Sequence, residues 1–455
     1  MMKTLQSTVN LVVRRFALSP RVRFAAIALA LTFSAALAAK GQALPAAEAS
    51  PISTGFGIPR VAGTLQWAVT GSETLSWGYY ANSGAAAATN LSGDMAYLSN
   101  SKQDPFSMVF AGGRSWSTSG EPSYTFLSLG LSQVINVGRW NFVLSDSVSY
   151  LPGTPIFGLS GVAGVGDLGV APVQVGVDSG QGLLTNYSPE VNNTSAASVQ
   201  RPITGKTYLD GSGSYTVLRF LDGAGGSGGY GLESDSLTGS AGFGHRVDAR
   251  TTFGANYAYS SFSFLNSLSN GVPESSFASQ TASFFYSRQV NRKLGFSVAA
   301  GPEWTKINVS GNTQSLNAYA DASINYAGEF SRWSLAYVRS TNSGYGVIGG
   351  ALSDSAVFSA GRIFARVWNC AANVSYSHTA NLPTPGVTPY SFETAVAGVQ
   401  ASRALAHNLS AYASFTVEDQ THASSNATID LFDGVSQVVG FGVTYSPSSK
   451  HFGRP

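Results

Sequence analysis

The sequence predicts an all-β protein whose antiparallel strands close into an up-and-down transmembrane barrel. Charged residues make up only 11% of the chain, whereas a soluble globular domain has roughly 25%. Glycine, phenylalanine and tyrosine are abundant, with 51, 26 and 20 copies. Beyond the N-terminal segment, no apolar run reaches the length of about 20 residues that a transmembrane helix requires. A closed barrel with a neutral polar interior and an apolar exterior explains this composition.

The N-terminal segment, residues 1–38, has the features of a cleaved secretion signal. Its basic residues precede a short apolar run from Phe24 to Leu37, which leads into the tripeptide Ala36-Leu37-Ala38. A basic region, a short apolar region and a small-residue cleavage motif define secretory signal peptides. The run is too short to span a bilayer as a helix, so a membrane anchor is the less favoured interpretation. We expect residues 39–63 to be a periplasmic linker.

Removal of this segment changes the net charge of the chain. The whole sequence has 26 basic and 24 acidic residues. Residues 1–38 hold five of the basic residues and none of the acidic ones, which leaves a net charge of −3 for the remainder. Because no basic patch remains, we expect no nucleic-acid partner. The single cysteine, Cys370, excludes an internal disulfide.

Strand-like alternation runs through most of the remaining chain, because successive side chains of a strand point to opposite faces. In residues 294–305 the apolar face is formed by Leu294, Phe296, Val298, Ala300 and Trp304. The opposite face of this segment is formed by Gly295, Ser297, Ala299, Gly301 and Glu303. The same pattern recurs at 316–326, 333–337, 368–377 and 409–418. The polar faces are small and neutral, which indicates a wet lumen rather than the charged surface of a soluble sandwich.

Short and long breaks between these strands alternate along the chain. Residues 136–139, 246–248 and 407–408 are short breaks, whereas 343–353 and 380–390 are long ones. Short periplasmic turns and long extracellular loops are typical of outer-membrane barrels. Counting the hairpins of residues 64–446 predicts about sixteen strands, and any number from about twelve to eighteen is compatible with the pattern.

Residues 151–230 form one anomalous connection, which the alternation of turns places on the extracellular side. The segment is rich in glycine and proline. A structureless loop of this length is uncommon unless it is functional or disordered. Three alternatives are compatible with its sequence. The segment folds into the lumen and narrows it, it forms a cap on the surface, or it contains two further strands. At the other end of the barrel domain, we expect residues 447–455 to be a C-terminal tail.

These features resemble those of bacterial outer-membrane β-barrels of the porin-like kind. The resemblance rests on the signal segment, the hairpins of residues 64–446 and the last strand, which looks like the family's terminal insertion signal. The apolar face of that strand is formed by Val439, Phe441, Val443 and Tyr445. Residues 446–455 follow it, whereas an aromatic residue usually ends the chain in this family. The resemblance implies an outer-membrane location, contact with lipid and insertion by the barrel assembly machinery. The short segment before the first strand leaves no room for a plug domain.

Two segments match sequence patterns of catalytic or cofactor-binding sites, but they lack the surrounding secondary structure that such sites require. Gly164, Gly166 and Gly169 match the dinucleotide-binding pattern, but no strand precedes them and no helix follows. Residues 225–229 match the nucleophile-elbow pattern and are better explained as a flexible linker. No zinc-site spacing occurs among the histidines, which are His245, His378, His407, His422 and His451. We therefore expect no catalytic residue, no cofactor and no metal; a Ser–His pair at the barrel rim is the minor alternative.

Three carboxylates fall on predicted polar faces and are candidate lumen-facing charges: Glu303, Asp321 and Glu418. Inward carboxylates can set the cation preference of a pore. Ordinary solvated wall residues are the alternative. Asp146 is an exception, because the alternation places it on an apolar face. We expect a bulge or a position near the rim to resolve that conflict.

Most tryptophans lie near the ends of predicted strands. We expect them to form an interfacial aromatic girdle rather than a ligand platform. This group comprises Trp67, Trp77, Trp140, Trp304, Trp333 and Trp368. Cys370 lies on the same apolar face as Trp368, so we expect it to face lipid as a small hydrophobic residue.

The resulting functional hypothesis is a porin-like channel for the passive diffusion of small polar solutes. Its physical reason is size, because about sixteen strands enclose more space than side chains can fill. A non-conducting surface or structural barrel that binds a partner through its long loops is the main alternative, and an outer-membrane enzyme is less favoured. The sequence leaves open the solute, the oligomeric state, the number of strands and the role of residues 151–230.

Overall fold

A computed structural model describes residues 63–78, 85–99, 101, 104–117, 123–151, 189–221, 232–265, 276–308, 313–344, 348–365, 367–383, 390–423, 433–447 and 450–451. The expected signal segment, residues 1–38, and the linker as far as residue 62 lie outside these ranges. In the described part of the chain, no helix is long and apolar enough to cross a membrane.

The regular elements of these ranges are β-strands. Their bounds are β1 (Thr64–Trp77), β2 (Ala85–Leu98), β3 (Phe106–Ser117), β4 (Tyr124–Val137), β5 (Trp140–Leu151), β6 (Glu190–Pro202), β7 (Thr207–Phe220), β8 (Ser234–Arg246), β9 (Thr251–Phe264), β10 (Ser276–Gln289), β11 (Leu294–Ile307), β12 (Thr313–Ala327), β13 (Ser331–Asn342), β14 (Ala351–Phe364), β15 (Trp368–Asn381), β16 (Ser391–Ala406), β17 (Leu409–Ala423), β18 (Gly434–Tyr445) and the short β19 (Lys450–His451).

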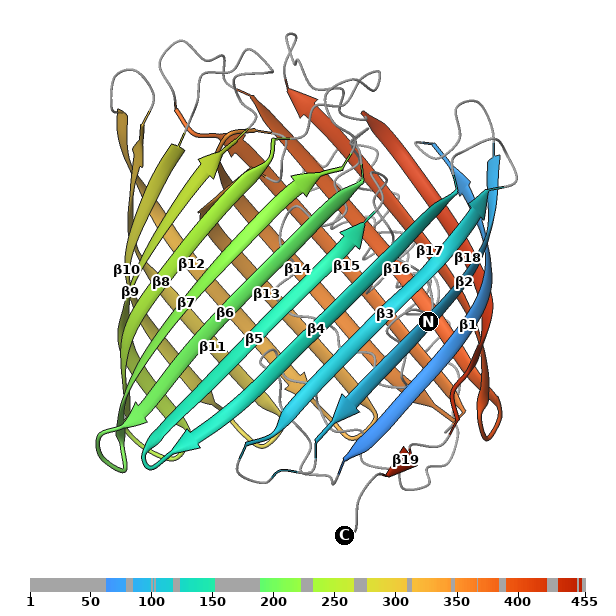
Figure 1. Cartoon of the computed structure of the whole chain (residues 1–455), viewed down its shortest axis with the longest axis horizontal. Coiled ribbons are helices and arrows are strands. Elements are labelled where there is room, and N and C mark those ends of the chain that lie inside the picture. The colour runs from blue at the N-terminus through green and yellow to red at the C-terminus, as the bar shows by residue number, and fades with distance from the viewer. Residues whose placement is uncertain are drawn as a thin grey trace, which may run out of the picture.

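The strands form one antiparallel sheet that closes on itself. Each strand from β1 to β17 pairs with the next along the chain, and β18 pairs back onto β1, from Val69 opposite Tyr445 to Trp77 opposite Gln437. Figure 1 shows the resulting cylinder, whose strands are inclined to its axis. The predicted all-β, closed, antiparallel up-and-down barrel is confirmed. Within the expected tail, β19 pairs with the first residues of β1.

The barrel has eighteen strands, whereas the sequence predicted about sixteen. The additional strands, β6 and β7, both lie within residues 151–230 and are fully paired with their neighbours. The expectation of one long loop is therefore wrong for these two strands, and the alternative of two further strands holds there. The remaining parts of that segment, residues 152–188 and 222–231, lie outside the described residues.

Both strands escaped detection because several outward positions in their middle are small or polar. The outer face of β6 carries Asn193, Ser195 and Ala197 in succession, and that of β7 carries Gly211 and Gly213. Pattern recognition depends on large apolar residues at every second position. Without such residues at every second position, the sequence of these two strands resembles that of a loop.

The short connections predicted from the sequence lie at the lower end of the barrel in Figure 1. In the turn between β4 and β5, Gly138 has a φ of +61°, which glycine adopts without the steric cost of a side chain. In the turn between β8 and β9, the Arg250 backbone N–H donates to Asp248 Oδ1 at 2.6 Å. This hydrogen bond lowers the pKa of the Asp248 carboxyl.

The two faces of the barrel wall differ in polarity. Large apolar side chains on the outer face are exposed, for example Phe284 at 77% and Leu316 at 67%. Serine, threonine and asparagine dominate the inner face, where Thr70 and Ser132 are each 1% exposed. This distribution matches a transmembrane barrel and is the reverse of a soluble protein, whose apolar side chains are inside.

Aromatic side chains border the outer apolar band at both ends. At the lower end, Trp67 packs against Tyr445 with ring centroids 5.8 Å apart, and Tyr326 stacks on Trp333 at 5.7 Å. At the upper end of β1, Trp77 is 38% exposed. The strand rise of about 3.4 Å and a tilt of about 40° place the two belts about 25 Å apart along the barrel axis. This spacing fits the apolar thickness of a membrane.

Candidate functional site: the lining and mouth of the barrel

The inner face of the barrel is the candidate functional surface, because a wall of this polarity suits contact with water and polar solutes. Hydroxyl groups of neighbouring strands bond to one another along it. Thr194 and Thr216 are 3.0 Å apart, and Ser377 and Thr394 are 2.6 Å apart. The lining is therefore a network of neutral groups, into which a few charges are set.

Glu303 on β11, Asp321 on β12 and Glu418 on β17 lie on this polar face. Glu303 and Asp321 are two rows apart on adjacent strands, since Glu303 pairs with Asn317 and Asp321 pairs with Ala299. Glu418 lies several strands away around the wall. It is 0% exposed, and neither of its carboxylate oxygens has a hydrogen-bond partner in the described part of the chain. Their role in ion preference stays a prediction.

Sequence reasoning missed three other carboxylates of the inner face. Asp94 on β2 follows Asn90 and Ser92 on the polar side of its strand, so its alternation was available as a signal. Glu190 and Asp210 lie on β6 and β7, which the sequence did not reveal.

Basic residues on the inner face are fewer and lie at strand ends. Arg246 is the last residue of β8, and Arg332 is the second residue of β13, both at the lower end of the barrel. The register places both on the inner side of the wall. Along the described wall, acidic side chains therefore outnumber basic ones, and the lining is electronegative.

The wall is interrupted near the upper end, between β12 and β13. Their ladder runs from Ala327 opposite Arg332 only as far as Ala320 opposite Arg339. Beyond that point, the backbone N–H of Thr341 has no strand partner on this side. It donates instead to the carboxylate of Glu303 on β11, at 3.3 Å from each oxygen. Glu303 therefore holds the end of β13 against the inner wall.

The end of the β13–β14 hairpin leans over the mouth of the barrel. A Cβ added to Gly350, just before β14, would lie 2.7 Å from Phe277 on β10 and 3.0 Å from Leu382, which follows β15. Phe277 and Leu382 belong to one buried apolar cluster with Phe264 and Ile307. Strands β10 and β15 are not neighbours in the sheet, so this cluster joins two parts of the rim.

Replacing Glu303 with alanine is expected to loosen this attachment. A buried N–H that loses its acceptor costs about 1–3 kcal/mol, so the Thr341 amide should exchange its hydrogen faster. Hydrogen–deuterium exchange in detergent measures this change locally. Glu303→Gln keeps an acceptor oxygen and should retain most of the protection. Unchanged exchange at Thr341 in both variants would contradict the assigned contact.

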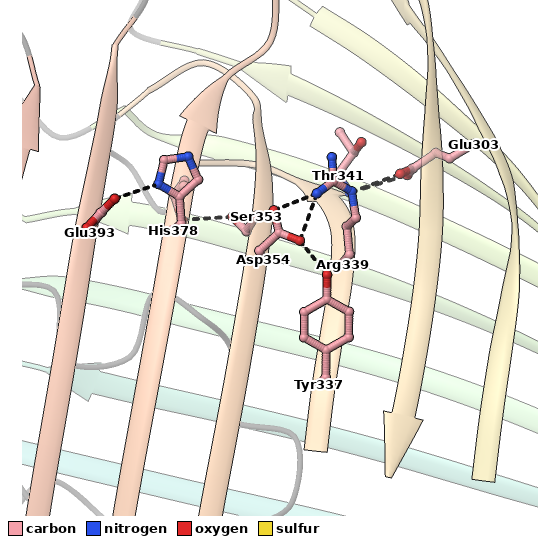
Figure 2. Close-up of polar contacts among 9 residues, drawn as sticks. Glu303, Tyr337, Arg339, Thr341, Ser353, Asp354, His378 and Glu393 are labelled. Atoms are coloured by element: carbon pink, nitrogen blue, oxygen red, sulfur yellow. Dashed lines mark hydrogen bonds and ion pairs between the residues drawn. The ribbon is translucent and has the colours of Figure 1, made fainter. Parts of the chain in front are cut away.

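A row of polar side chains crosses the outer face close to the upper rim (Figure 2). Arg339 donates to both oxygens of Asp354, at 2.9 and 2.7 Å, and the Tyr337 hydroxyl donates to Asp354 at 2.6 Å. On the next two strands, His378 Nδ1 lies 3.4 Å from a Glu393 oxygen. Within the row, Arg339 and Asp354 therefore form one polar pair, and His378 and Glu393 form a second.

This row does not form a catalytic arrangement of the kind considered from the sequence. A Ser–His enzyme requires a serine hydroxyl within hydrogen-bonding reach of the histidine. In the described residues, the ring of His378 contacts Glu393 and no serine hydroxyl. A histidine at the other end of the barrel, His245, bonds to the hydroxyl of Thr207 at 3.0 Å. No group of three or more potential metal ligands occurs in the same part of the chain.

Comparisons with known proteins find similarity in structure alone. No protein-family model matches the chain, and no curated protein matches it. Among solved structures, the chain is similar to OpdQ of Pseudomonas aeruginosa, with 10% identity, a TM-score of 0.40, and coverage of 85% of this chain and 98% of that one. OccK2 (OpdF) of the same organism, solved in complex with glucuronate, has 11% identity, a TM-score of 0.41, and coverage of 84% and 97%.

The siderophore receptor PiuA from Acinetobacter baumannii is also similar, with 10% identity, a TM-score of 0.37, and coverage of 86% of this chain and 82% of that one. At such identities and TM-scores, these similarities carry no information about what the present chain binds or transports.

Proposed function

We propose that this chain is an outer-membrane porin-like channel through which small polar solutes diffuse passively. The observation that carries the proposal is the closed eighteen-strand barrel with a polar inner face and an apolar outer face. Barrels of about 16–18 strands enclose an aqueous channel, because side chains are too short to fill them. A channel of this kind needs no catalytic residue and no cofactor.

The outer face supports the proposed outer-membrane location. Its exposed apolar band between two aromatic belts would be unstable in water and is stabilised by acyl chains. The secretion signal of residues 1–38 would deliver the chain, and the barrel assembly machinery would insert it. Both steps are part of the proposal, since residues 1–38 lie outside the described residues.

The solutes that suit this lining are neutral or cationic. Hydroxyl and amide groups line most of the wall and can exchange hydrogen bonds with a passing polar solute. The excess of carboxylates, including Glu303, Asp321 and Glu418, repels anions. The apolar cluster that contains Phe277 and Leu382 lies at the upper rim, and we expect it to limit the size of the solutes.

The purified, refolded chain is expected to open discrete channels in planar lipid bilayers. The reason is the water-filled interior, which conducts ions without a conformational cycle. Single-channel recording in KCl measures the conductance, and heat-modifiable migration on SDS gels confirms that the same sample is folded. A folded protein that opens no channel would contradict the proposal and favour a non-conducting barrel that binds a partner through its loops.

A further inference from the structure

The outer face carries a charge where lipid contact does not explain one. Asp146 lies in the middle of β5, between Trp140 and Tyr150, and its register with β4 and β6 is continuous. The expected bulge or rim position is therefore wrong. The Ser195 hydroxyl donates to Asp146 Oδ1 at 2.5 Å, and the Asn193 amide lies 3.4 Å from the same oxygen.

The opposite wall has no such feature. On that wall, the outward residues Arg339 of β13 and Asp354 of β14 form an ion pair at 2.7 Å, and the outward positions in the middle of β15 are the uncharged Cys370, Ala372 and Val374. An ionised group at mid-depth in a membrane is costly unless protein or water surrounds it. The Asp146 cluster therefore indicates that this part of the barrel contacts protein.

Small residues lie beside this cluster on the outer face, where they form a shallow depression between larger side chains. Ala197, Gly213 and Gly239 form one row across β6–β8, and Gly211 and Ala241 lie in the next row. A Cβ added to Gly239 would meet nothing within 4 Å, and one added to Gly213 would meet only Thr238 O at 3.7 Å. The barrel itself does not require glycine there. Small residues at such positions let a second polypeptide approach closely.

Tyrosines lie on the far side of the small residues. The row of Asp146 reaches β9 at Ser261. A row of paired residues runs perpendicular to the strands, which are tilted in the direction that Figure 1 shows. With strands about 4.8 Å apart and tilted by about 40°, each step from one strand to the next toward β9 raises the row about 3 Å along the barrel axis. The β9 residue level with Asp146 is thus about four residues below Ser261, which is Tyr257. Tyr257 and Tyr259 both face outward and are 46% and 40% exposed.

We propose that the outer surface of β5–β9 packs against the same surface of a second copy of this chain. A two-fold interface requires a patch that is complementary to itself. With the axis along the membrane normal beside Gly213, the Asp146 cluster of one copy lies opposite Tyr257 and Tyr259 of the other. The Tyr257 hydroxyl already donates to Gln280 at 3.1 Å, which leaves the Tyr259 hydroxyl to donate to Asp146. The small residues between them allow the two walls to meet.

This inference rests on the proposed membrane location but not on conduction. A dimer that opens no channel would end the channel proposal alone, and a conducting monomer would end this one alone. The inferred partner is a second copy of this chain, because the acceptor cluster and the phenol groups lie on the two sides of one low surface in the same chain.

Disulfide cross-linking tests the contact. In a Cys370→Ser background, Gly213→Cys places a thiol next to the proposed axis, and Ala397→Cys places one on the opposite wall. We expect oxidation in lipid vesicles to convert Gly213→Cys to a covalent dimer and to leave Ala397→Cys monomeric. Equal cross-linking of both variants, or none at Gly213→Cys, would overturn the proposal.

Filling the low surface provides a second test that does not depend on oxidation. Gly239→Trp should lower the dimer affinity at least about tenfold, measured by light scattering in mild detergent. Gly71→Trp is the matched control, because Gly71 also faces outward and an added Cβ there meets nothing within 4 Å. Heat-modifiable migration shows whether each variant is folded. A wild-type protein that is monomeric in both detergent and vesicles would also refute the proposal.

Discussion

Arginine at position 372 is expected to destabilise the barrel by about 2–4 kcal/mol, because it would place a charge against acyl chains near mid-membrane. Ala372 faces outward on β15, midway between Trp368 and Tyr376, which lie in the two aromatic belts. The free energy of unfolding in urea, measured in lipid vesicles, gives the size of the effect. Few other single substitutions on the barrel wall should lower the free energy of unfolding by a larger amount.

The adjacent residue provides the control. Asn373 lies on the inner face and is exposed there, so an arginine side chain at this position has room and water. Asn373→Arg should therefore change the stability by less than about 1 kcal/mol. If both variants lost a similar amount of unfolding free energy, the outer face would not contact lipid while the inner face contacts water. The proposed position of the barrel in a membrane would then be wrong.

The same contrast explains how much of the fold could be predicted from the sequence. On β11, apolar residues alternate with small polar ones from Leu294 to Trp304, and the structure has both the strand and its two faces. Alternation of this kind reports which side of a strand meets lipid, because each environment selects its own residues. The closure of β18 onto β1 follows from the same logic, since a free edge in a membrane would leave backbone groups unpaired.

The prediction failed where the outer face does not follow that rule. In the middle of β6 and β7, the outward residues Ala197, Gly211 and Gly213 are small, and the proposed contact with a second copy explains why lipid did not select larger ones. Asp146 was recognised from the sequence as a conflict, but only the continuous register shows that the conflict is real. Both failures therefore have one physical source, which is a stretch of wall that another protein surface, rather than lipid, would cover.

Part of the candidate site could not be predicted for a different reason. Alternation assigned Glu303 to the polar face, but its bond to the Thr341 backbone depends on where the β12–β13 ladder ends. The apolar cluster that contains Phe277 and Leu382 likewise depends on how the end of the β13–β14 hairpin, at Gly350, bends over the mouth. Residues far apart in the sequence and not on paired strands leave no periodic signal, so these contacts need the three-dimensional structure.

Neutralising the lining is expected to reduce the cation preference of the channel. In the double variant Asp210→Asn, Asp321→Asn, two half-buried inward carboxylates become amides of similar size. The low-dielectric wall of a barrel concentrates the field of such charges in the water between them. The reversal potential in a tenfold KCl gradient should therefore move toward zero relative to the wild type. Glu303 is left intact, because its carboxylate also holds Thr341.

The matched control removes the same charge from the other side of the wall. Glu73 and Glu393 face outward on β1 and β16, so Glu73→Gln, Glu393→Gln should leave the reversal potential unchanged. Raising the salt concentration to about 1 M, where the screening length is about 3 Å, should also diminish the difference between the wild type and the inward variant. If the outward pair shifted the potential as much as the inward pair, the carboxylates would act through the net charge of the protein. Assignment of ion preference to the lining would then fail, even if the channel itself conducts.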